Sequence, residues 1–233
     1  GDIGFRHYYQ FNLDQGDIAN LIFKMQQSGV NIEQFVNLVD KTININGIIN
    51  TMRDNNFYGG RAIFVSPNGM VVGASGVLNV GSLTAIAPAP NDYLRFAGAT
   101  MGQGVLNDAA NNLGVSSVID IPGAGSFEDN MTRIEAADQK GDINIQGKII
   151  ARNDVSLKGK NIIIGQEGSI NKAGIVAGVG ANNITNNHGN ADQILTTNKQ
   201  AENLFNALVN NDVVSGKGFG NENGKITIAA QSF

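Results

Sequence analysis

The sequence contains no cysteine. The protein can therefore form no disulfide, no reactive thiolate and no cysteine-ligated zinc site. A chain without cysteine suits a protein that is exported before it folds, and it suits a cytosolic protein equally well. Cysteine usage does not place this protein in a compartment.

Long apolar runs and strong charge are also absent. No segment approaches the roughly 18 consecutive apolar residues of a membrane span, and no basic and then apolar signal segment opens the sequence, so we expect any signal peptide to have been removed before residue 1. Only 15% of the residues are charged, and the formal net charge is -4 with a pI of about 5.1. Such a chain has no electrostatic attraction for phosphate backbones or anionic membranes, so we expect no nucleic-acid partner.

The sequence has only two histidines, His7 and His188. They lie far apart and lack the carboxylate-histidine spacing of a zinc site or of a Ser-His-Asp triad, so we interpret both as surface or capping residues. The glycine-rich stretches that begin at Gly98 and Gly123 lack the Gly-Lys-Ser/Thr ending of a phosphate-binding loop. We therefore predict no metal, no cofactor and no enzymatic activity.

Glycine and asparagine are both abundant, with 30 glycines in 233 residues and asparagine about as frequent. Both residues tolerate positive φ, and asparagine also bonds its own turn or stacks in ladders along successive strands. Their joint excess indicates a turn-rich structure of stacked short strands.

Short isoleucine-rich strands recur along the sequence. TININGIIN from Thr42 and DINIQGKII from Asp142 share an Ile-Asn-Ile core, a glycine corner and two isoleucines, and related segments begin at Gly159 (GKNIII) and Gly224 (GKITIAA). Strands this short cannot each bury a face alone, but coils of roughly 20 residues stack them at about 4.8 Å per coil. The pattern predicts an all-β parallel β-helix. An antiparallel β-sandwich is the competing fold, which is expected to have longer strands joined by two-residue hairpin loops.

We predict a single domain over residues 1–233, with an N-terminal cap, extra-helical strands and one or two short helices. Around the central Gly16, the segment HYYQFNLDQGDIANLIF predicts two short strands. The expected parts are cap strands at 1–39, the first coils at 40–90, an extra-helical excursion at 91–138, further coils at 139–189, a flanking helix at 190–211 and a last coil at 212–233.

An alternative is a carbohydrate-binding or polysaccharide-cleaving β-helix. Such enzymes cluster aspartates with arginine or lysine on one face of the coils. The best candidates here are Asp138, Asp142, Arg152 and Asp154. Aspartate at a corner is also ordinary turn chemistry, and that explanation is the stronger one.

The segment from Ile63 to Ala87, IFVSPNGMVVGASGVLNVGSLTAIA, contains a strand, a tight turn, a strand, a glycine-rich corner and a further strand. It resembles the two-partner secretion domain of filamentous haemagglutinin-like and leukotoxin-like exoproteins. In that family an Asn-Pro-Asn-Gly turn precedes a pattern similar to Val-Asn-Val-Gly-Gly-Leu-Val-Ala. Here Ser66 replaces the first asparagine and Ser82 the second glycine. The similarity spans most of the chain and is weak across 91–138 and 190–209.

The resemblance implies a right-handed parallel β-helix that addresses a longer exoprotein to an outer-membrane TpsB-type transporter with periplasmic POTRA domains. It implies passage through the periplasm of a double-membrane bacterium to the cell surface or the medium. The full-length protein would be an adhesin, a leukotoxin-like cytolysin or a contact-dependent growth inhibitor, with host-cell glycans or receptors as further partners. We expect the domain to be a monomer. The site residues that the resemblance assigns are Ser66, Pro67, Asn68, Gly69, Asn79, Val80 and Gly81.

The turn at residues 66–69 also has a purely structural interpretation. Pro67 presets φ, Asn68 tolerates unusual backbone regions and Gly69 permits positive φ, so the segment reverses the chain between buried strands. Residues 66–69 therefore have two alternative roles, closing a coil or contacting a transporter. Because a folded coil cannot cross a narrow barrel, we expect the transporter to recognise an extended chain, by strand addition to its POTRA domains.

Overall fold

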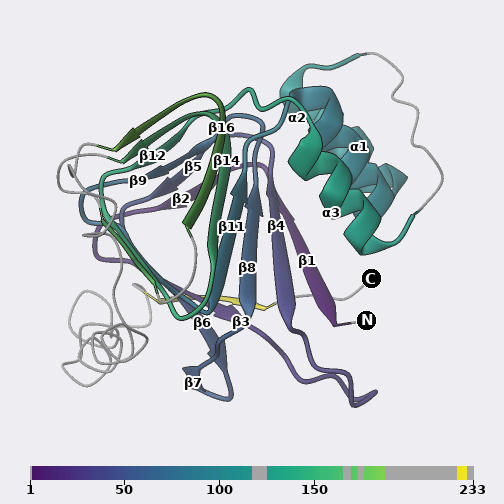
Figure 1. Ribbon diagram of the computed structural model, residues 1–233. Helices are drawn as coiled ribbons and strands as arrows, with labels where there is room; N and C mark the ends of the chain where they lie inside the picture. The colour runs from purple at the N-terminus through teal and green to yellow at the C-terminus, as the bar shows by residue number, and fades with distance from the viewer. Residues whose placement is uncertain (1, 117–124, 165–168, 173–175, 187–224, 230–233) are drawn as a thin grey trace.

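In the computed structural model most strands pair in parallel with their counterparts one coil away along the chain (Figure 1). The structure describes residues 2–116, 125–164, 169–172, 176–186 and 225–229. Two sheets with ten and seven strands contain three ladders of stacked strands. The architecture is therefore an all-β parallel fold with few helices.

The first ladder contains β1 (Ile3–Tyr8), β4 (Gln34–Val39), β8 (Arg61–Val65), β11 (Ser82–Ile86) and the first part of β14 (Val155–Ile164). The second contains β2 (Phe11–Leu13), β5 (Ile43–Ile45), β9 (Met70–Val72), β12 (Ile143–Ile145) and the last part of β14. The third contains β17 (Lys225–Ala229), β3 (Ile18–Ile22), β6 (Ile48–Arg53), β10 (Val77–Val80), β13 (Lys148–Ala151) and β15 (Ser169–Lys172). β16 (Val176–Asn186) pairs with β14.

The recurring Ile-Asn-Ile segments form two rungs of the second ladder, β5 and β12. Ile43 and Ile45 of β5 and Ile143 and Ile145 of β12 are buried on either side of β9, while the asparagine between each pair is partly exposed. This alternation is the period of two expected for a strand with one buried face. The strand expectation for these repeats is confirmed. The parallel pairing also excludes the antiparallel β-sandwich for the described strands.

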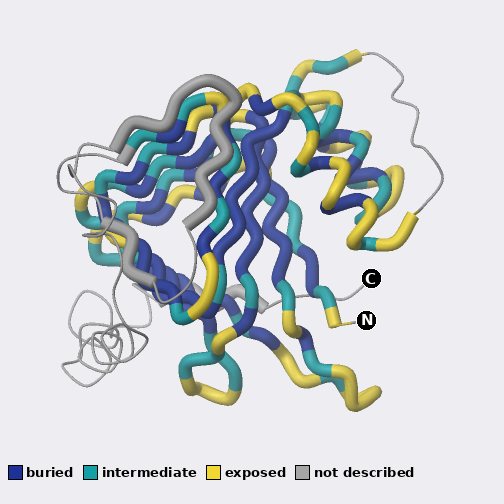
Figure 2. Tube along the Cα trace, in the orientation of Figure 1, coloured by how far each residue is buried: buried dark blue, intermediate teal, exposed yellow. Residues whose placement is uncertain are grey.

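The inward faces of all three ladders form one hydrophobic core, which we call the inner core (Figure 2). Its aromatic members meet edge to face, as in the pair Phe11 and Phe64, whose ring centroids lie 5.7 Å apart. In the third ladder Leu78 stacks between Ile49 and Ile149, and all three are fully buried. Each rung therefore covers the apolar face of the next.

A layer of helices covers the outer face of the first ladder (Figure 1). It consists of α1 (Pro90–Met101), α2 (Gln103–Leu113) and α3 (Phe127–Ala136), the last of which begins with a capping box between Ser126 and Asp129. Outward side chains of the ladder pack against this layer in a second cluster: Phe5, Val36, Leu38, Ile63, Val65 and Ile86. The expected excursion at 91–138 thus contains three helices, where we had expected one or two short helices in the whole chain. No helix among the described residues has the length and apolar character of a membrane span.

The other expected segments have these positions. The first 39 residues contain β1 to β4, and β1 to β3 pair in parallel with β4 to β6. A short strand, β7 (Asn56–Phe57), pairs antiparallel with β6 outside the ladders. The predicted helix at 190–211 lies outside the described residues. Within 212–233 the described strand is β17, and it pairs with β3 at the opposite edge of the sheet from β15.

We predict that Leu78→Ala lowers the free energy of unfolding by about 2–5 kcal/mol, because the cavity would separate the inward faces of three rungs. Urea denaturation followed by circular dichroism measures the change. Val30→Ala is the control, since Val30 is 43% exposed. Equal effects of the two substitutions would contradict the stacked core.

Candidate functional site

The predicted turn Ser66–Gly69 joins β8 to β9 at the corner between the first and second ladders. The Gly69 N–H donates to the Ser66 carbonyl at 3.2 Å, and the Asn68 N–H donates to Ser66 Oγ at 3.2 Å. Gly69 has a φ of 87°, as the sequence predicted. A Cβ at position 69 would overlap the backbone oxygen of Asp142 on the next coil. The turn therefore needs glycine for both its conformation and its packing.

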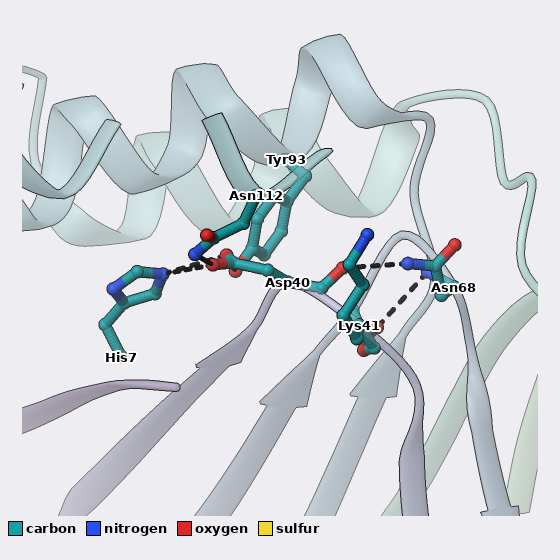
Figure 3. A network of polar contacts seen from close by, with 7 residues as sticks. His7, Asp40, Lys41, Asn68, Tyr93 and Asn112 are labelled. Carbon is teal, nitrogen blue, oxygen red and sulfur yellow. Dashed lines mark hydrogen bonds and ion pairs between the residues drawn. The ribbon is translucent and has the colours of Figure 1, made fainter. Parts of the chain in front are cut away.

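Two side chains of the turn bind the corner of the preceding coil (Figure 3). Ser66 Oγ donates to the Lys41 carbonyl at 2.5 Å, and Asn68 Nδ2 donates to the Asp40 carbonyl at 2.8 Å. On the other side, the Met70 N–H donates to the Asp142 carbonyl at 3.0 Å. The turn is thus held between the coils before and after it.

The four residues of the turn differ in exposure. Ser66, Pro67 and Gly69 are buried, and only Asn68 is exposed. A partner of the folded corner would meet Asn68 and little else of the turn.

Asp40 is the buried centre of the polar network beside this turn. Its carboxylate lies 2.8 Å and 2.9 Å from His7 Nε2, and it accepts hydrogen bonds of 2.7 Å from the Tyr93 hydroxyl and 2.7 Å from Asn112 Nδ2. These partners come from β1, α1 and α2. A buried carboxylate is stable only with such partners, so Asp40 joins the coil corner to the helical layer.

Tyr93 is a permanent donor in this network. Burial, and then the charge and hydrogen bond of Asp40, raise the pKa of Tyr93 well above its ordinary value of 10.0. The hydroxyl therefore keeps its proton at neutral pH and can donate to Asp40.

The second predicted segment, Asn79–Gly81, lies in a different sheet from the turn, at the end of β10. Asn79 Nδ2 donates to Asn50 Oδ1 at 2.9 Å, and Asn50 Nδ2 donates to Asn20 Oδ1 at 3.2 Å. This buried asparagine ladder stops at β13, where Ile150 stands opposite Asn79, and Asn79 Oδ1 is buried without a hydrogen-bond partner. The two predicted segments do not form one site.

The other two residues of this segment have packing roles. Val80 is buried in the inner core, and Gly81 lies so close to Gly59 that a Cβ would overlap its backbone. The Gly81 requirement is therefore steric.

The residues of the carbohydrate alternative lie at two different corners: Asp138 and Asp142 precede β12, whereas Arg152 and Asp154 lie between β13 and β14. Asp142 Oδ1 accepts from the backbone N–H and the side chain of Asn161 at 3.2 Å and 2.8 Å, and the Arg152 guanidinium lies 3.9 Å from the centroid of the Phe57 ring. Asp138 and Asp154 accept backbone hydrogen bonds through their carbonyl groups. Among the described residues, no group of three or more histidine or carboxylate side chains could hold a metal ion. This arrangement favours a structural role for Asp142, whose side chain accepts hydrogen bonds at a coil corner.

The sequence interpretation missed Asp40, Tyr93 and Asn112. It also treated His7 as a surface or capping residue, whereas His7 is partly buried against Asp40. A local signal exists for Asp40, because a carboxylate directly follows the apolar strand that ends at Val39. Its partners lie 53 and 72 residues further on, where no local pattern connects them to Asp40. His188 lies outside the described residues.

Comparison of the chain with protein-family models, with curated proteins and with solved structures finds no match.

We predict that Gly69→Ala destabilises the protein more than Gly29→Ala. Both glycines have positive φ, but a Cβ at position 29 meets nothing within 4 Å, whereas one at 69 meets the Asp142 backbone. The Gly29 change should therefore cost only the strain of the backbone, about 1 kcal/mol, and the Gly69 change should cost that plus a steric overlap. Thermal unfolding of both variants measures the difference. Similar melting temperatures would contradict the packing of the turn on Asp142.

We predict that Tyr93→Phe lowers the free energy of unfolding by about 1–3 kcal/mol, because it removes a donor from a buried carboxylate. Tyr9→Phe is the control, since Tyr9 is 54% exposed. The same pair tests the pH dependence. Tyr93 holds its proton more tightly when folded, so it contributes stability that is complete below pH 10 and is lost as the pH rises above 10.

Urea denaturation at several pH values between 8 and 11 measures both effects on one series of samples. Tyr93→Phe should flatten the alkaline fall in stability only in part, because Tyr8 and Tyr58 also have raised pKa values. Parallel curves for wild type and Tyr93→Phe would contradict the assignment of Tyr93.

Proposed function

We propose that this chain is a secretion domain of a large exported adhesin or toxin, and that its ladders are the coils of a right-handed parallel β-helix. A dedicated outer-membrane transporter with POTRA domains recognises the domain in the periplasm. The domain then starts β-helix folding at the surface of a double-membrane bacterium. Host-cell contacts belong to the full-length protein.

The stacking of the ladders supports the β-helix. The chain visits the first, second and third ladders in that order through β1 to β3, again through β4 to β6, and again through β8 to β10. β14 turns from the first ladder into the second within one strand, with a register shift between Gly159 and Asn161. Three parallel ladders visited in a repeating order are the arrangement expected of a solenoid.

The observation that carries the proposed function is the Ser66–Gly69 turn, followed on the same coil by Asn79–Gly81 at the end of β10. Their sequences and their order resemble those of the two-partner secretion domain. The turn is buried except for Asn68, so a transporter that reads the whole turn must meet it before the corner has folded. This favours recognition of an extended chain.

The core gives such a domain a physical reason to fold after export. Each new coil buries the inward isoleucines of the previous one, at about 25 cal/mol for each Å² of apolar surface. Folding outside the membrane would oppose return of the chain through the transporter. The absence of cysteine means that no disulfide has to form during this passage.

The test is export from a Gram-negative host that expresses the domain together with a candidate outer-membrane POTRA transporter. We predict that Ser66→Ala and Asn68→Ala each reduce the amount of domain in the medium roughly tenfold, which corresponds to about 1.4 kcal/mol of recognition free energy. The host without the transporter should export none. Immunoblots of the medium and the periplasm measure both quantities.

Tyr93→Phe is the matched control for these variants. Like Asn68→Ala, it removes one hydrogen bond to the Asp40–Lys41 corner, but it leaves the turn sequence unchanged. Ser66→Ala removes one hydrogen bond to that corner and a second one within the turn. Its export should equal that of wild type. If Tyr93→Phe reduces export as much as the turn variants do, the turn acts only through folded stability. Normal export of both turn variants, or export without the transporter, contradicts the proposed function.

A further inference from the structure

β17 occupies an unexpected edge of the seven-stranded sheet. In the third ladder β3, β6, β10, β13 and β15 follow one another in chain order, whereas β17, the last described strand, lies beside β3 (Figure 1). It pairs in parallel from Lys225 opposite Ile18 to Ala229 opposite Ile22. β17 thus extends the first coil.

The register explains why β3 accepts this strand. Ile226 and Ile228 stand opposite Ala19 and Leu21, which are fully buried members of the inner core. β17 has the sequence Lys-Ile-Thr-Ile-Ala, and β13, Lys-Ile-Ile-Ala, holds the same register with its lysine in line with Lys225. The local pattern of β17 therefore suits the third ladder.

The other edge of the same sheet is less suitable. There β15 places Ile170 and Lys172 at the register positions of Ile149 and Ala151, which belong to the inner core. A strand added to β15 in the same register would put its second isoleucine opposite a lysine. Charged residues are disfavoured at core positions, so the β3 edge is the better site for β17.

We propose that β17 is a closing strand: when residues 225–229 dock on β3, they complete and stabilise the first coil, and until then that coil is incomplete. Without it β3 would have β6 as its one ladder neighbour, and Ala19 and Leu21 would lose the rung that stands opposite them. A contact between segments this far apart in sequence forms late, because the chain must close a long loop first. The first coil of the chain is therefore the last to reach full stability.

This inference does not depend on the proposed secretion role. It applies to any chain that emerges with its N-terminus first, from a ribosome or from a transporter. In such a chain the first coil lacks its outer strand until β17 has emerged.

Hydrogen–deuterium exchange on the full chain tests this role of β17. The variant is Ile226→Pro with Thr227→Pro. Successive N–H groups of a strand point to opposite sides, so one of these two faces β3, and proline removes both. Ile226→Val with Thr227→Val is the control that keeps both N–H groups. We expect exchange in peptides covering 18–22 to become about tenfold faster in the proline variant, with exchange in 77–80 unchanged.

The same exchange data contain the results that overturn the proposal. Slow exchange at 18–22 in the proline variant would show that β3 does not need β17. An equal acceleration at 18–22 and 77–80 would show a global loss of stability and no local role of β17.

Cross-linking tests the position of β17 independently. Because the sequence has no native cysteine, only the introduced cysteines can react. Asn20 and Thr227 are register partners, so Asn20→Cys with Thr227→Cys should be joined by a short thiol-specific reagent. Asn171→Cys with Thr227→Cys is the matched pair for the β15 edge and should stay unlinked. A link from 171 in place of 20 would overturn the proposal.

Discussion

Each short strand of this protein has a buried face only because the strands one coil before and one coil after present the same face in register. In the second ladder Ile43, Met70 and Ile143 share one inward position, and a shift of one residue in any of these strands would turn its own core residue outward. The corners must therefore have fixed lengths and conformations. Glycines at positions 69 and 81, where a Cβ would overlap the neighbouring coil, follow from that requirement.

Asp40 extends the same constraint to the helical layer. Its backbone carbonyl holds the turn through Asn68, and its carboxylate holds His7, Tyr93 and Asn112. The network replaces water around a buried carboxylate, and it does so only when the first coil and two helices are in place. One carboxylate thereby couples the docking of the helices to the geometry of a corner of the coils.

The sequence predicted what depends on local pattern. The Ile-Asn-Ile repeats identified the strands, and Pro67 with Gly69 identified the turn, because period and positive φ are properties of a few neighbouring residues. The partners of Asp40 could not be predicted, since Tyr93 and Asn112 meet it only after the whole helical segment has folded back. The position of β17 escaped prediction for a different reason, because its sequence is similar to that of β13 and does not by itself indicate which edge of the third ladder it joins.

Under the proposed function, the burial of the turn limits when a transporter could bind it. A folded corner presents Asn68 and covers Ser66, Pro67 and Gly69, so most of the motif is accessible only in the extended chain. In the folded corner, the side chains of Ser66 and Asn68 donate hydrogen bonds to the carbonyl groups of Lys41 and Asp40. Recognition and folding would then compete for the same two side chains. Under the proposed function, such a motif would be read before folding and covered by folding, and this order would give export a direction.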